Sequence, residues 1–549
     1  MFGWLKGNWT EQVDVVVLGT GAAGLVAALR AHAEGASVVI LEKSDRVGGT
    51  TAVSGGVVWI PNNPKMAAAG VPDSRAEALT YLTRIADGRS EAALVERFLD
   101  VGPDLITWLE ANTPLRFSAL SRYPDYHPEF PGGKPGGRSM ETGLFDTKLL
   151  GEWAPRLRRS PIFGGTPMTV EEATTWGVFS NPLGLPYREL GKRYKEGMVC
   201  YGGSLIGGLL RACLDRKILP QLKVAARELV TEEDRVIGVV AETDGKERRI
   251  RARKGVILAT GGFEWSADLN RRFLGGILTH PNSPPTNTGD GLTMAMAVGA
   301  GLGNMNEAWW CPSVVVPGED YDGRQLNRGD FAIRSLPHSI LVNRRGQRFV
   351  NEAHNYNDMM KPFFHFDPVA YERPNLPAWL VLDHQFLEKY ILVTSVPGME
   401  PPEWITRSDT LDGLAAKIGV DVAGLRATVE RFNQYAESGV DADFRRGEST
   451  YDHFYGDPKQ RPNPNLGALV KAPFYALPVF PGAIGTKGGA RTDVHARVQH
   501  VSGAPIRGLY AAGNVMAGVT GAGYPGAGAT IAMAMVWGSI AGQHAAKES

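Results

Sequence analysis

The chain has 549 residues, and its 58 Lys and Arg balance 58 Asp and Glu, so the formal net charge is zero. This balance gives no electrostatic reason to expect nucleic acid as a partner. A hydrophobic share of 43% with 21% charged residues excludes a disordered or fibrous chain. The 67 glycines, about 12% of the chain against roughly 7% in average proteins, require a local explanation.

Cysteine usage and hydropathy bear on the compartment. Cys200, Cys213 and Cys311 form no CxxC pair and no disulfide framework. The N-terminal residues lack the pattern of a signal peptide, and the longest mostly apolar run, 529–542, is too short and too rich in glycine to span a bilayer. We expect a cytoplasmic protein, either free or in peripheral contact with the inner face of the membrane.

The N-terminal region predicts a βαβ unit. Val13–Leu18 is a continuous β-branched run, typical of a strand buried on both faces. The sequence Gly19-Thr20-Gly21-Ala22-Ala23-Gly24 follows at once, then a helix over Leu25–Glu34 and a second strand over Ala36–Leu41 that ends in Glu42.

The rest of the chain alternates regular and irregular stretches. Residues 121–200 and 308–480 lack clear periodicity and are expected to be largely irregular. The regular elements expected in chain order are two helices within 75–112, a helix over 203–217, short strands within 222–260, a helix over 411–436, a strand over 508–514 that enters a glycine-rich turn, and a last helix over 530–546.

Gly19, Gly21 and Gly24 satisfy the GxGxxG pattern in the context that gives it meaning. The first glycine allows a tight turn, the second lets the backbone approach a pyrophosphate, and the third lets helix and strand pack closely. The helix N-terminus offers N–H groups to phosphate oxygens. Glu42 can accept hydrogen bonds from ribose hydroxyls. The pattern therefore predicts a dinucleotide site.

A second GxGxxG match over 521–526 serves as an internal control. No strand is expected after its helix, so it cannot open a second βαβ unit. A flavoprotein with its own NAD(P)H domain is therefore not expected.

Other loops with small residues favour FAD over an exchangeable NAD, because a cofactor touched along the whole chain is long and buried. The residues expected to bind FAD non-covalently are Gly19, Thr20, Gly21, Ala22, Ala23, Gly24, Glu42, Lys43, Ser44, Gly48, Gly49, Thr50, Thr51, Ser54, Gly55, Gly56, Ala259, Thr260, Gly261, Gly262, Asp290, Gly513, Asn514 and Gly528. No metal site is expected.

The segments VVVLGTGAAGL, LEKSDRVGGTTAVSGG, ATGGF, TGDG and GLYAAGN, in this order, resemble the fumarate reductase/succinate dehydrogenase-type flavoproteins. Within that superfamily the chain most resembles the 3-ketosteroid Δ1-dehydrogenases, along almost its whole length and least at 143–200 and 361–400. We expect an α/β fold with a Rossmann-like FAD-binding domain, over 1–307 and 487–549, and an inserted α+β substrate domain over 308–486.

Three patches carry the narrower resemblance: YPDYHP at 123–128, NEAHNYN at 351–357 and YPGAG at 524–528. By this resemblance Tyr356 would be the base, Tyr126 would assist it, and Tyr524 with the Gly528 N–H would hold the ketone oxygen of the substrate. Two donors on that oxygen would stabilise the developing enolate.

Other assignments near these patches remain open. A free tyrosine has a pKa of about 10, so a second tyrosine within hydrogen-bond reach is needed to share the charge. Tyr123 is an alternative to Tyr126. His127 and His354 could be acid–base groups, although local hydrogen bonds are the simpler interpretation.

The resemblance implies oxidation of a 3-ketosteroid to the 1-ene-3-one, with electrons passed to a quinone or another acceptor. A fumarate reductase-like activity on a dicarboxylate is disfavoured, because no Lys, Arg or His occurs from Val515 to Gln543. A Δ4-(5α)-ketosteroid dehydrogenase and a non-enzymatic flavin carrier remain alternatives.

Residues 143–200 mix apolar and aromatic side chains, including Trp153, Phe163 and Phe179, with basic ones such as Arg158 and Lys192. This composition suits a segment that dips into a membrane interface. We favour the alternative that it is a lid packed over the substrate cleft.

Overall fold

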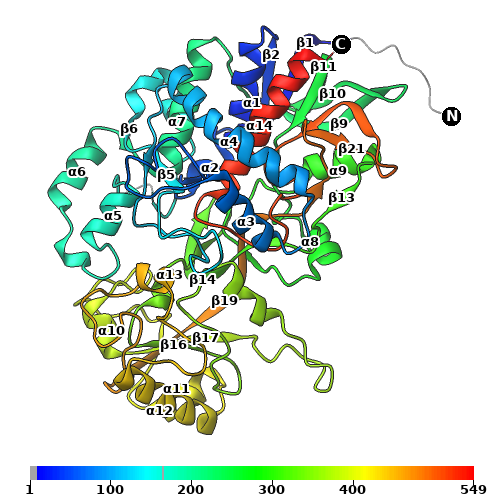
Figure 1. Cartoon of the computed structure of the whole chain (residues 1–549). Helices are drawn as coiled ribbons and strands as arrows, with labels where there is room; N and C mark the ends of the chain where they lie inside the picture. Colours follow the sequence, from blue (N-terminus) through cyan, green and yellow to red (C-terminus); the bar gives the residue numbers. More distant parts are fainter. Residues whose placement is uncertain (1–8, 164–165, 549) are drawn as a thin grey trace.

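The structure is a computed structural model that describes residues 9–163 and 166–548. Two large sheets organise it, one in the upper part of Figure 1 and one that extends into the lower part. The upper part contains both ends of the described chain, and the lower part contains the middle of the sequence. The predicted α/β class is confirmed, while the domain boundaries at 307 and 486 stay a prediction.

The first sheet has a parallel centre, in which β11 lies between β1 and β22, and β2 lies between β1 and β8. Val15, Val16 and Val17 are fully buried, as expected for a strand covered on both faces. The strands of this sheet are β1 (Glu11–Leu18), β2 (Val38–Glu42), β8 (Gln221–Leu222), β9 (Ala225–Glu232), β10 (Arg235–Thr243), β11 (Lys246–Leu258), β21 (Arg497–Gln499) and β22 (Pro505–Ala511).

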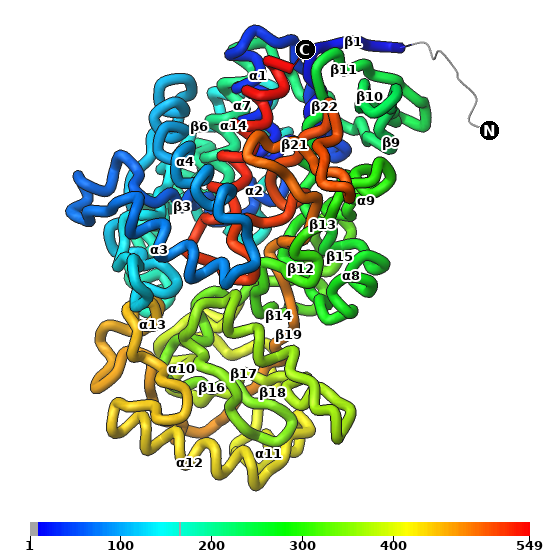
Figure 2. The backbone as a smooth tube through the Cα atoms, turned by 45° about the vertical axis from the view of Figure 1, so that its right-hand side comes forward, coloured from blue at the N-terminus to red at the C-terminus, as the bar shows by residue number. Residues whose placement is uncertain are grey.

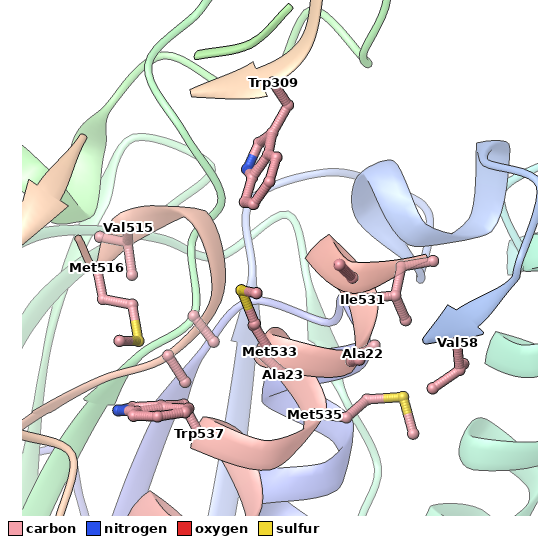
Figure 3. Close-up of a cluster of buried hydrophobic side chains, with 14 of the residues drawn as sticks. Ala22, Ala23, Val58, Trp309, Val515, Met516, Ile531, Met533, Met535 and Trp537 are labelled. Carbon is pink, nitrogen blue, oxygen red and sulfur yellow. The ribbon is translucent and has the colours of Figure 1, made fainter. Parts of the chain in front are cut away.

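The last helix, α14 (Ala529–Lys547), packs along α1 (Ala22–Ala33). A Cβ added at Gly538 would lie 2.4 Å from the Ala23 carbonyl oxygen, so glycine is what permits the close crossing. Figure 3 shows Met533 and Trp537 of α14 beside Ala22 and Ala23, below the ring of Trp309. The end of the chain thus folds back onto its beginning.

The remaining helices surround the two sheets. The pair within 75–112, the helix near 203–217 and the helical stretch near 411–436 were expected, whereas the other helices were not. They are α2 (Gly49–Val53), α3 (Arg75–Ala86), α4 (Ala92–Asn112), α5 (Val170–Trp176), α6 (Tyr187–Lys195), α7 (Tyr201–Asp215), α8 (Ala267–Leu274), α9 (Asp290–Ala297), α10 (His384–Lys389), α11 (Leu411–Ile418), α12 (Val422–Ser438) and α13 (Thr450–Phe454), with the 3-10 turns η1 (Thr147–Arg156), η2 (Pro182–Gly184), η3 (Ile333–Ser335), η4 (Asp358–Phe364) and η5 (Gly513–Val515).

The expectation that 308–480 is irregular was wrong, because this stretch supplies most of the second sheet. In Figure 2, β14 and β19 lie side by side between the upper and lower parts. The strands are β12 (His280–Pro281), β14 (Ala308–Tyr321), β15 (Arg324–Gly329), β16 (Ser339–Val342), β17 (Ala378–Asp383), β18 (Thr406–Ser408) and β19 (Phe474–Thr486), and all pairs except β12–β19 are antiparallel.

The single helix expected over 411–436 is two helices. Gly419 ends α11 in the left-handed region at φ +68°, and Asp421 caps α12 by accepting from the Gly424 N–H. Short two- and three-residue strands complete the fold: β3 (Val58–Trp59), β4 (Ser118–Ala119), β5 (Ser139–Glu141), β6 (Phe145–Asp146), β7 (Met198–Val199), β13 (Leu302–Gly303) and β20 (Gly489–Ala490).

Candidate active site

The residues expected to bind FAD converge at the carboxyl ends of the parallel strands, where ligands bind in open α/β sheets. Gly19–Gly24 follow β1, Glu42–Ser44 end and follow β2, Ala259–Gly262 follow β11, and Gly513 and Asn514 lie just after β22. Contacts join these loops: the Gly48 N–H donates to Thr20 Oγ1 at 3.0 Å, and the Ala22 N–H donates to Thr51 Oγ1 at 3.3 Å.

The glycines of this region divide into two groups. A Cβ at Gly19 would lie 2.3 Å from the Ala259 carbonyl oxygen, and one at Gly24 would lie 2.0 Å from the Gly19 oxygen, so these glycines serve the packing of the chain itself. A Cβ at Gly21 or Gly49 would meet no heavy atom closer than 3.8 Å, and one at Gly55 would meet none within 4 Å. The second group leaves backbone that a bound group can approach.

The N-terminus of α1 fits a pyrophosphate. Its N-cap is Gly21, which has no side chain to bond the first-turn N–H groups, and that turn contains no acidic residue. Anions are favoured at such a position by the N–H groups and the helix dipole. The chain's own residues therefore suit the cofactor that the sequence predicts.

Glu42 lies at the end of β2, as predicted, and already accepts hydrogen bonds from other residues of the chain. Its Oε2 accepts from the Thr20 N–H at 3.1 Å and from the Thr20 hydroxyl at 2.6 Å, and its Oε1 accepts from the Ser44 N–H at 2.9 Å. A carboxylate has about four lone-pair sites, so Oε1 retains capacity for a ribose hydroxyl.

Several cofactor candidates make specific side-chain contacts with one another or with residues that the sequence did not indicate. Lys43 Nζ forms an ion pair with Asp290 at 2.7 Å, and Asn514 Oδ1 accepts from Trp309 Nε1 at 3.2 Å. Asn287 was missed, although its side chain donates to Thr50 Oγ1 at 2.7 Å. No local motif indicates an asparagine whose hydrogen-bond partner lies 237 positions away in the sequence.

Three tyrosines from distant segments meet beside this region. Tyr126 lies between β4 and β5, Tyr356 precedes η4, and Tyr524 precedes α14. The Tyr126 hydroxyl donates to the Tyr356 hydroxyl at 2.7 Å, and the ring centres of Tyr126 and Tyr356 lie 4.9 and 5.6 Å from that of Tyr524. The Tyr126 N–H donates to the Pro525 carbonyl at 3.0 Å, which joins two of the segments through backbone.

Burial governs the protonation of all three phenols. It raises the pKa of Tyr126 and of Tyr356 well above the usual value, and neighbouring tyrosines add to the effect. The hydrogen bond from Tyr126 acts in the opposite direction and lowers the pKa of Tyr356. The pair is thus protonated at rest, and Tyr126 favours the phenolate form of Tyr356.

Tyr524 and Gly528 lie together just before α14. Burial raises the pKa of Tyr524, while hydrogen bonds with Thr530, Tyr356 and the Gly528 backbone lower it. The Tyr524 hydroxyl lies 3.2 Å from Thr530 Oγ1. Gly528 has φ +92°, and a Cβ there would lie 2.1 Å from the Val57 carbonyl oxygen, so both the conformation and the space require glycine.

A row of aromatic rings extends from the tyrosines toward the 143–200 segment. Successive ring centres along Tyr126, Tyr451, Tyr455 and Phe179 are 5.0, 5.9 and 6.4 Å apart. Tyr123, the alternative to Tyr126, lies beside this row, and its hydroxyl lies 2.5 Å from that of Tyr455. The phenol hydroxyls are the only polar side-chain atoms of these rings.

A buried lysine, which the sequence analysis missed, lies beside Tyr524. Lys487 Nζ donates to the carbonyls of Ala522 and Gly523 at 2.6 and 2.9 Å and lies 4.4 Å from the ring centre of Trp309. Burial lowers the pKa of Lys487 to about 7. The stretch from Val515 to Gln543 lacks cations, but the fold brings one to it from the end of β19.

The 143–200 segment has both buried and exposed apolar side chains. Trp153 and Arg158 are buried, and Arg158 donates to Ser44 Oγ at 2.8 Å beside the cofactor loops. Leu183 and Tyr194 are 69% and 62% exposed. Among residues 9–163 and 166–548, no helix is long and apolar enough to cross a membrane. That the segment is a lid, with a membrane contact as the alternative, stays a prediction.

Comparisons with known proteins identify relatives along almost the whole chain. The family described as FAD binding domain matches residues 14–531. The 4-oxocyclohexanecarboxylate 2-dehydrogenase of Sinomonas cyclohexanicum is 41% identical over 98% of this chain and 94% of its own length. The 3-oxosteroid 1-dehydrogenase of Mycobacterium tuberculosis is 40% identical over 98% and 99%.

A solved structure shows the same arrangement along the whole chain. The 3-ketosteroid Δ1-dehydrogenase from Sterolibacterium denitrificans, in complex with 1,4-androstadiene-3,17-dione, superposes with a TM-score of 0.91 at 40% identity, over 98% of this chain and all of its own. The protein is therefore an FAD-binding flavoprotein oxidoreductase of the fumarate reductase type, and it belongs to the 3-oxosteroid 1-dehydrogenase family.

Proposed function

We propose that the protein introduces a double bond between C1 and C2 of 3-ketosteroids and passes the electrons to a quinone or another acceptor. The observation that carries this proposal is the meeting of Tyr126, Tyr356, Tyr524 and Gly528, which supplies a paired phenol base and two donors for a ketone oxygen. Bound FAD would supply the two-electron acceptor.

The roles follow from the hydrogen bonds. Tyr524 O–H and Gly528 N–H hold the C3 ketone oxygen and stabilise the negative charge that develops when C2 loses its proton. Tyr356 takes that proton in its phenolate form, which the Tyr126 O–H, 2.7 Å away, stabilises, and the hydride from C1 would go to FAD. The start of α14 adds a favourable dipole at the oxygen.

A steroid, rather than a small ring, is supported by the aromatic row from Tyr126 to Phe179. The four aromatic rings in succession form an apolar row that is longer than one cyclohexane ring. The zero net charge of the chain is also consistent with a neutral substrate that needs no electrostatic steering.

A small keto acid is the second candidate substrate, and the chemistry at its ketone would be the same. It is favoured by the relative that acts on 4-oxocyclohexanecarboxylate and by the buried ammonium of Lys487 near Tyr524. Among the described residues, no carboxylate lies within ion-pair distance of Lys487, so a substrate carboxylate could pair with it.

Turnover of both substrates by the wild type and by Phe179→Ala separates the candidates. A steroid dehydrogenase should turn over 4-androstene-3,17-dione and give the 1,2-ene. Phe179→Ala should then raise the KM for the steroid several-fold. A residual rate on a small cyclic ketone should stay unchanged and serves as the internal control. Turnover of the keto acid alone would reject the steroid, and a 4,5-ene from a 5α-steroid would reject the Δ1 position.

A further inference from the structure

A buried polar network lies behind the three tyrosines. His127 directly follows Tyr126, and Asp358 lies two residues after Tyr356. His127 Nε2 and Asp358 Oδ2 are 2.7 Å apart, and the two side chains are 11% and 23% exposed. The segments that carry the two phenols are therefore joined twice, once through the phenol hydroxyls and once through this pair.

Asp358 is fixed from its own side of the network as well. Asn355 Nδ2 donates to Asp358 Oδ2 at 3.1 Å, and Asn357 Nδ2 donates to Asp358 Oδ1 at 2.7 Å. The Asp358 N–H donates back to Asn355 Oδ1 at 3.0 Å, which closes the turn that begins η4. Hydrogen bonds thus fix the orientation of both carboxylate oxygens of Asp358.

The same network reaches β14 and the Tyr524 turn. Asn357 Oδ1 accepts from the Trp310 N–H at 3.3 Å, and Asn357 Nδ2 lies 3.5 Å from the Ala522 carbonyl oxygen. That carbonyl also accepts from Lys487 Nζ at 2.6 Å. All three tyrosine-bearing segments are consequently held by one connected set of side chains.

The pair is charged at neutral pH. Burial lowers the pKa of His127, but hydrogen bonds to Asp358 and Glu129 outweigh it and raise the pKa to about 9. Burial raises the pKa of Asp358, but the His127 hydrogen bond and charge outweigh it and hold the pKa well below its usual range. Loss of one partner from such a buried pair leaves an uncompensated charge.

We propose that His127 and Asp358 form a positioning pair that keeps the hydroxyls of Tyr126 and Tyr356 in hydrogen-bond contact and thereby sets the rate of proton removal from the substrate. The pair does not touch the reacting atoms; it acts through the tyrosines. The kinetic part of this inference rests on the proposed function, and the geometric part stands on the contacts alone.

The geometry favours an ion pair over a metal site. His127, His354 and Asp358 could share a metal, since their ligand atoms lie within 4.8 Å of one another. The atoms that a metal would take from His127 and Asp358 are already 2.7 Å apart, a direct charge-assisted hydrogen bond. Asn355 Nδ2, a donor that cannot ligate a cation, faces Nε2 of both histidines at 3.4 and 3.3 Å.

The kinetic test compares Asp358→Asn, His127→Ala and His127→Gln in the FAD-loaded enzyme. Misplacement of reacting groups by about 1 Å can cost on the order of a hundredfold, so kcat should fall ten- to a hundredfold in the first two variants with KM nearly unchanged. Gln can place a donor at the Nε2 position, so His127→Gln should recover most of kcat. The isotope effect on kcat with steroid deuterated at C2 should rise in the impaired variants.

Asp441→Asn is the matched control. Asp441 is a buried carboxylate that accepts from Arg348 at 3.0 and 2.8 Å, in a separate ion-pair cluster. Its replacement should lower Tm without a change in the C2 isotope effect. If Asp358→Asn behaves in the same way, or if His127→Gln is as impaired as His127→Ala, the pair is only structural and the proposal is overturned.

Crystal structures of the wild type and Asp358→Asn test the geometric part without reliance on turnover. The proposal expects the separation of the Tyr126 and Tyr356 oxygens to exceed hydrogen-bond distance in the variant, and an unchanged 2.7 Å contact overturns it. Stoichiometric zinc or iron in the purified wild type, lost in His127→Ala, also overturns it. Absence of steroid turnover by the wild type refutes the proposed function alone.

Discussion

Tyr524 and Gly528 lie within five residues of each other, yet the proposed role of Tyr524 uses its side chain and that of Gly528 uses its backbone. Tyr524 is 1% exposed and is surrounded by Trp309, Tyr126 and Tyr356. In such a water-poor site, each donor to a developing oxyanion is worth more than it would be in water. The two residues can therefore be tested separately.

Replacement of Tyr524 by Phe removes one of the two proposed donors and leaves the ring. We expect kcat/KM for the steroid to fall on the order of a hundredfold or more, with FAD content unchanged by absorbance. Tyr390→Phe is the control, because Tyr390 is equally buried and donates to Asp457 at 2.8 Å away from the site. Near-normal turnover by Tyr524→Phe would remove this residue from the mechanism.

Gly528→Ala tests the backbone donor. The added Cβ would lie 2.1 Å from the Val57 carbonyl oxygen, so the turn must move, and we expect a large loss of kcat/KM together with a lower Tm. Gly503→Ala is matched in backbone strain, since Gly503 also has φ +92° but has no atom within 4 Å of its Cβ position. The control should lose some stability and keep its activity; equal activity in both variants contradicts the role of Gly528.

Tyr126→Phe tests the proposed assistance to the base. The hydrogen bond from Tyr126 lowers the pKa of Tyr356, so its loss should raise that pKa further. The rising limb of kcat against pH should then shift to higher pH, since the proposed base acts only when deprotonated. An unshifted limb, measured with C2-deuterated and unlabelled steroid, would show that Tyr126 does not assist.

At the scale of elements, the β1–α1 turn contains glycines that serve the packing of the chain and others that we propose face the cofactor. Gly21→Ala should leave the Tm of the apoprotein unchanged, because the new Cβ would meet no atom of the chain closer than Thr51 Oγ1 at 3.8 Å, and should weaken FAD binding, because the Cβ would occupy space proposed for the cofactor. Gly24→Ala should lower the Tm of the apoprotein itself, because the Cβ would meet the Gly19 carbonyl oxygen at 2.0 Å. Calorimetry and flavin fluorescence measure the two effects; the same loss of stability in both variants contradicts the division.

The first sheet could be predicted because its information is local. The β-branched run 13–18, the glycine turn and the following helix lie within about thirty residues, and a strand buried on both faces needs no alternation. The second sheet was missed because β14 and β19 both contain Pro and Gly and pair across more than 150 residues. The break at Gly419 could have been found from this glycine together with the N-cap residue Asp421 two positions later, whereas Gly413 and Gly424 lie inside the helices.

The tyrosines were predicted only through family resemblance, since nothing in the spacing of 16 tyrosines separates catalytic from structural ones. Their meeting in the fold agrees with that prediction, while their catalytic roles remain proposals. Lys487 and Asp358 carry no local signal, because their importance arises from contacts with segments far away in sequence. The contacts of such side chains can be identified only when the topology of the fold is known.

At the scale of the whole molecule, the candidate active site joins segments that lie far apart in the sequence, so its ion pairs also affect the stability of the whole chain. The pKa of His127 is about 9 in the folded chain and about 6.5 when unfolded. The stabilising effect of its proton is therefore complete below pH 6.5 and is lost as pH rises through 9. Asp358, Glu129 and His354 are the titratable groups that face it.

Thermal unfolding of the wild type and of His127→Gln at pH 6.5 and pH 9.5 measures this contribution. The wild type should have the larger Tm advantage at pH 6.5, and the difference should shrink at pH 9.5. The comparison between variants is needed because Lys487 has the opposite effect. Burial lowers its pKa to about 7, so its contribution makes the folded protein more stable as pH rises over the same range. A constant difference in Tm contradicts a charged His127 in the folded chain.

Anaerobic reduction of the bound flavin by 4-androstene-3,17-dione, with the double bond of the product located by NMR, tests the central claim most directly. We expect bleaching of the flavin in proportion to the steroid added and a product with a new double bond between C1 and C2. Flavin that 4-oxocyclohexanecarboxylate bleaches and the steroid does not, or a double bond at another position, would contradict it.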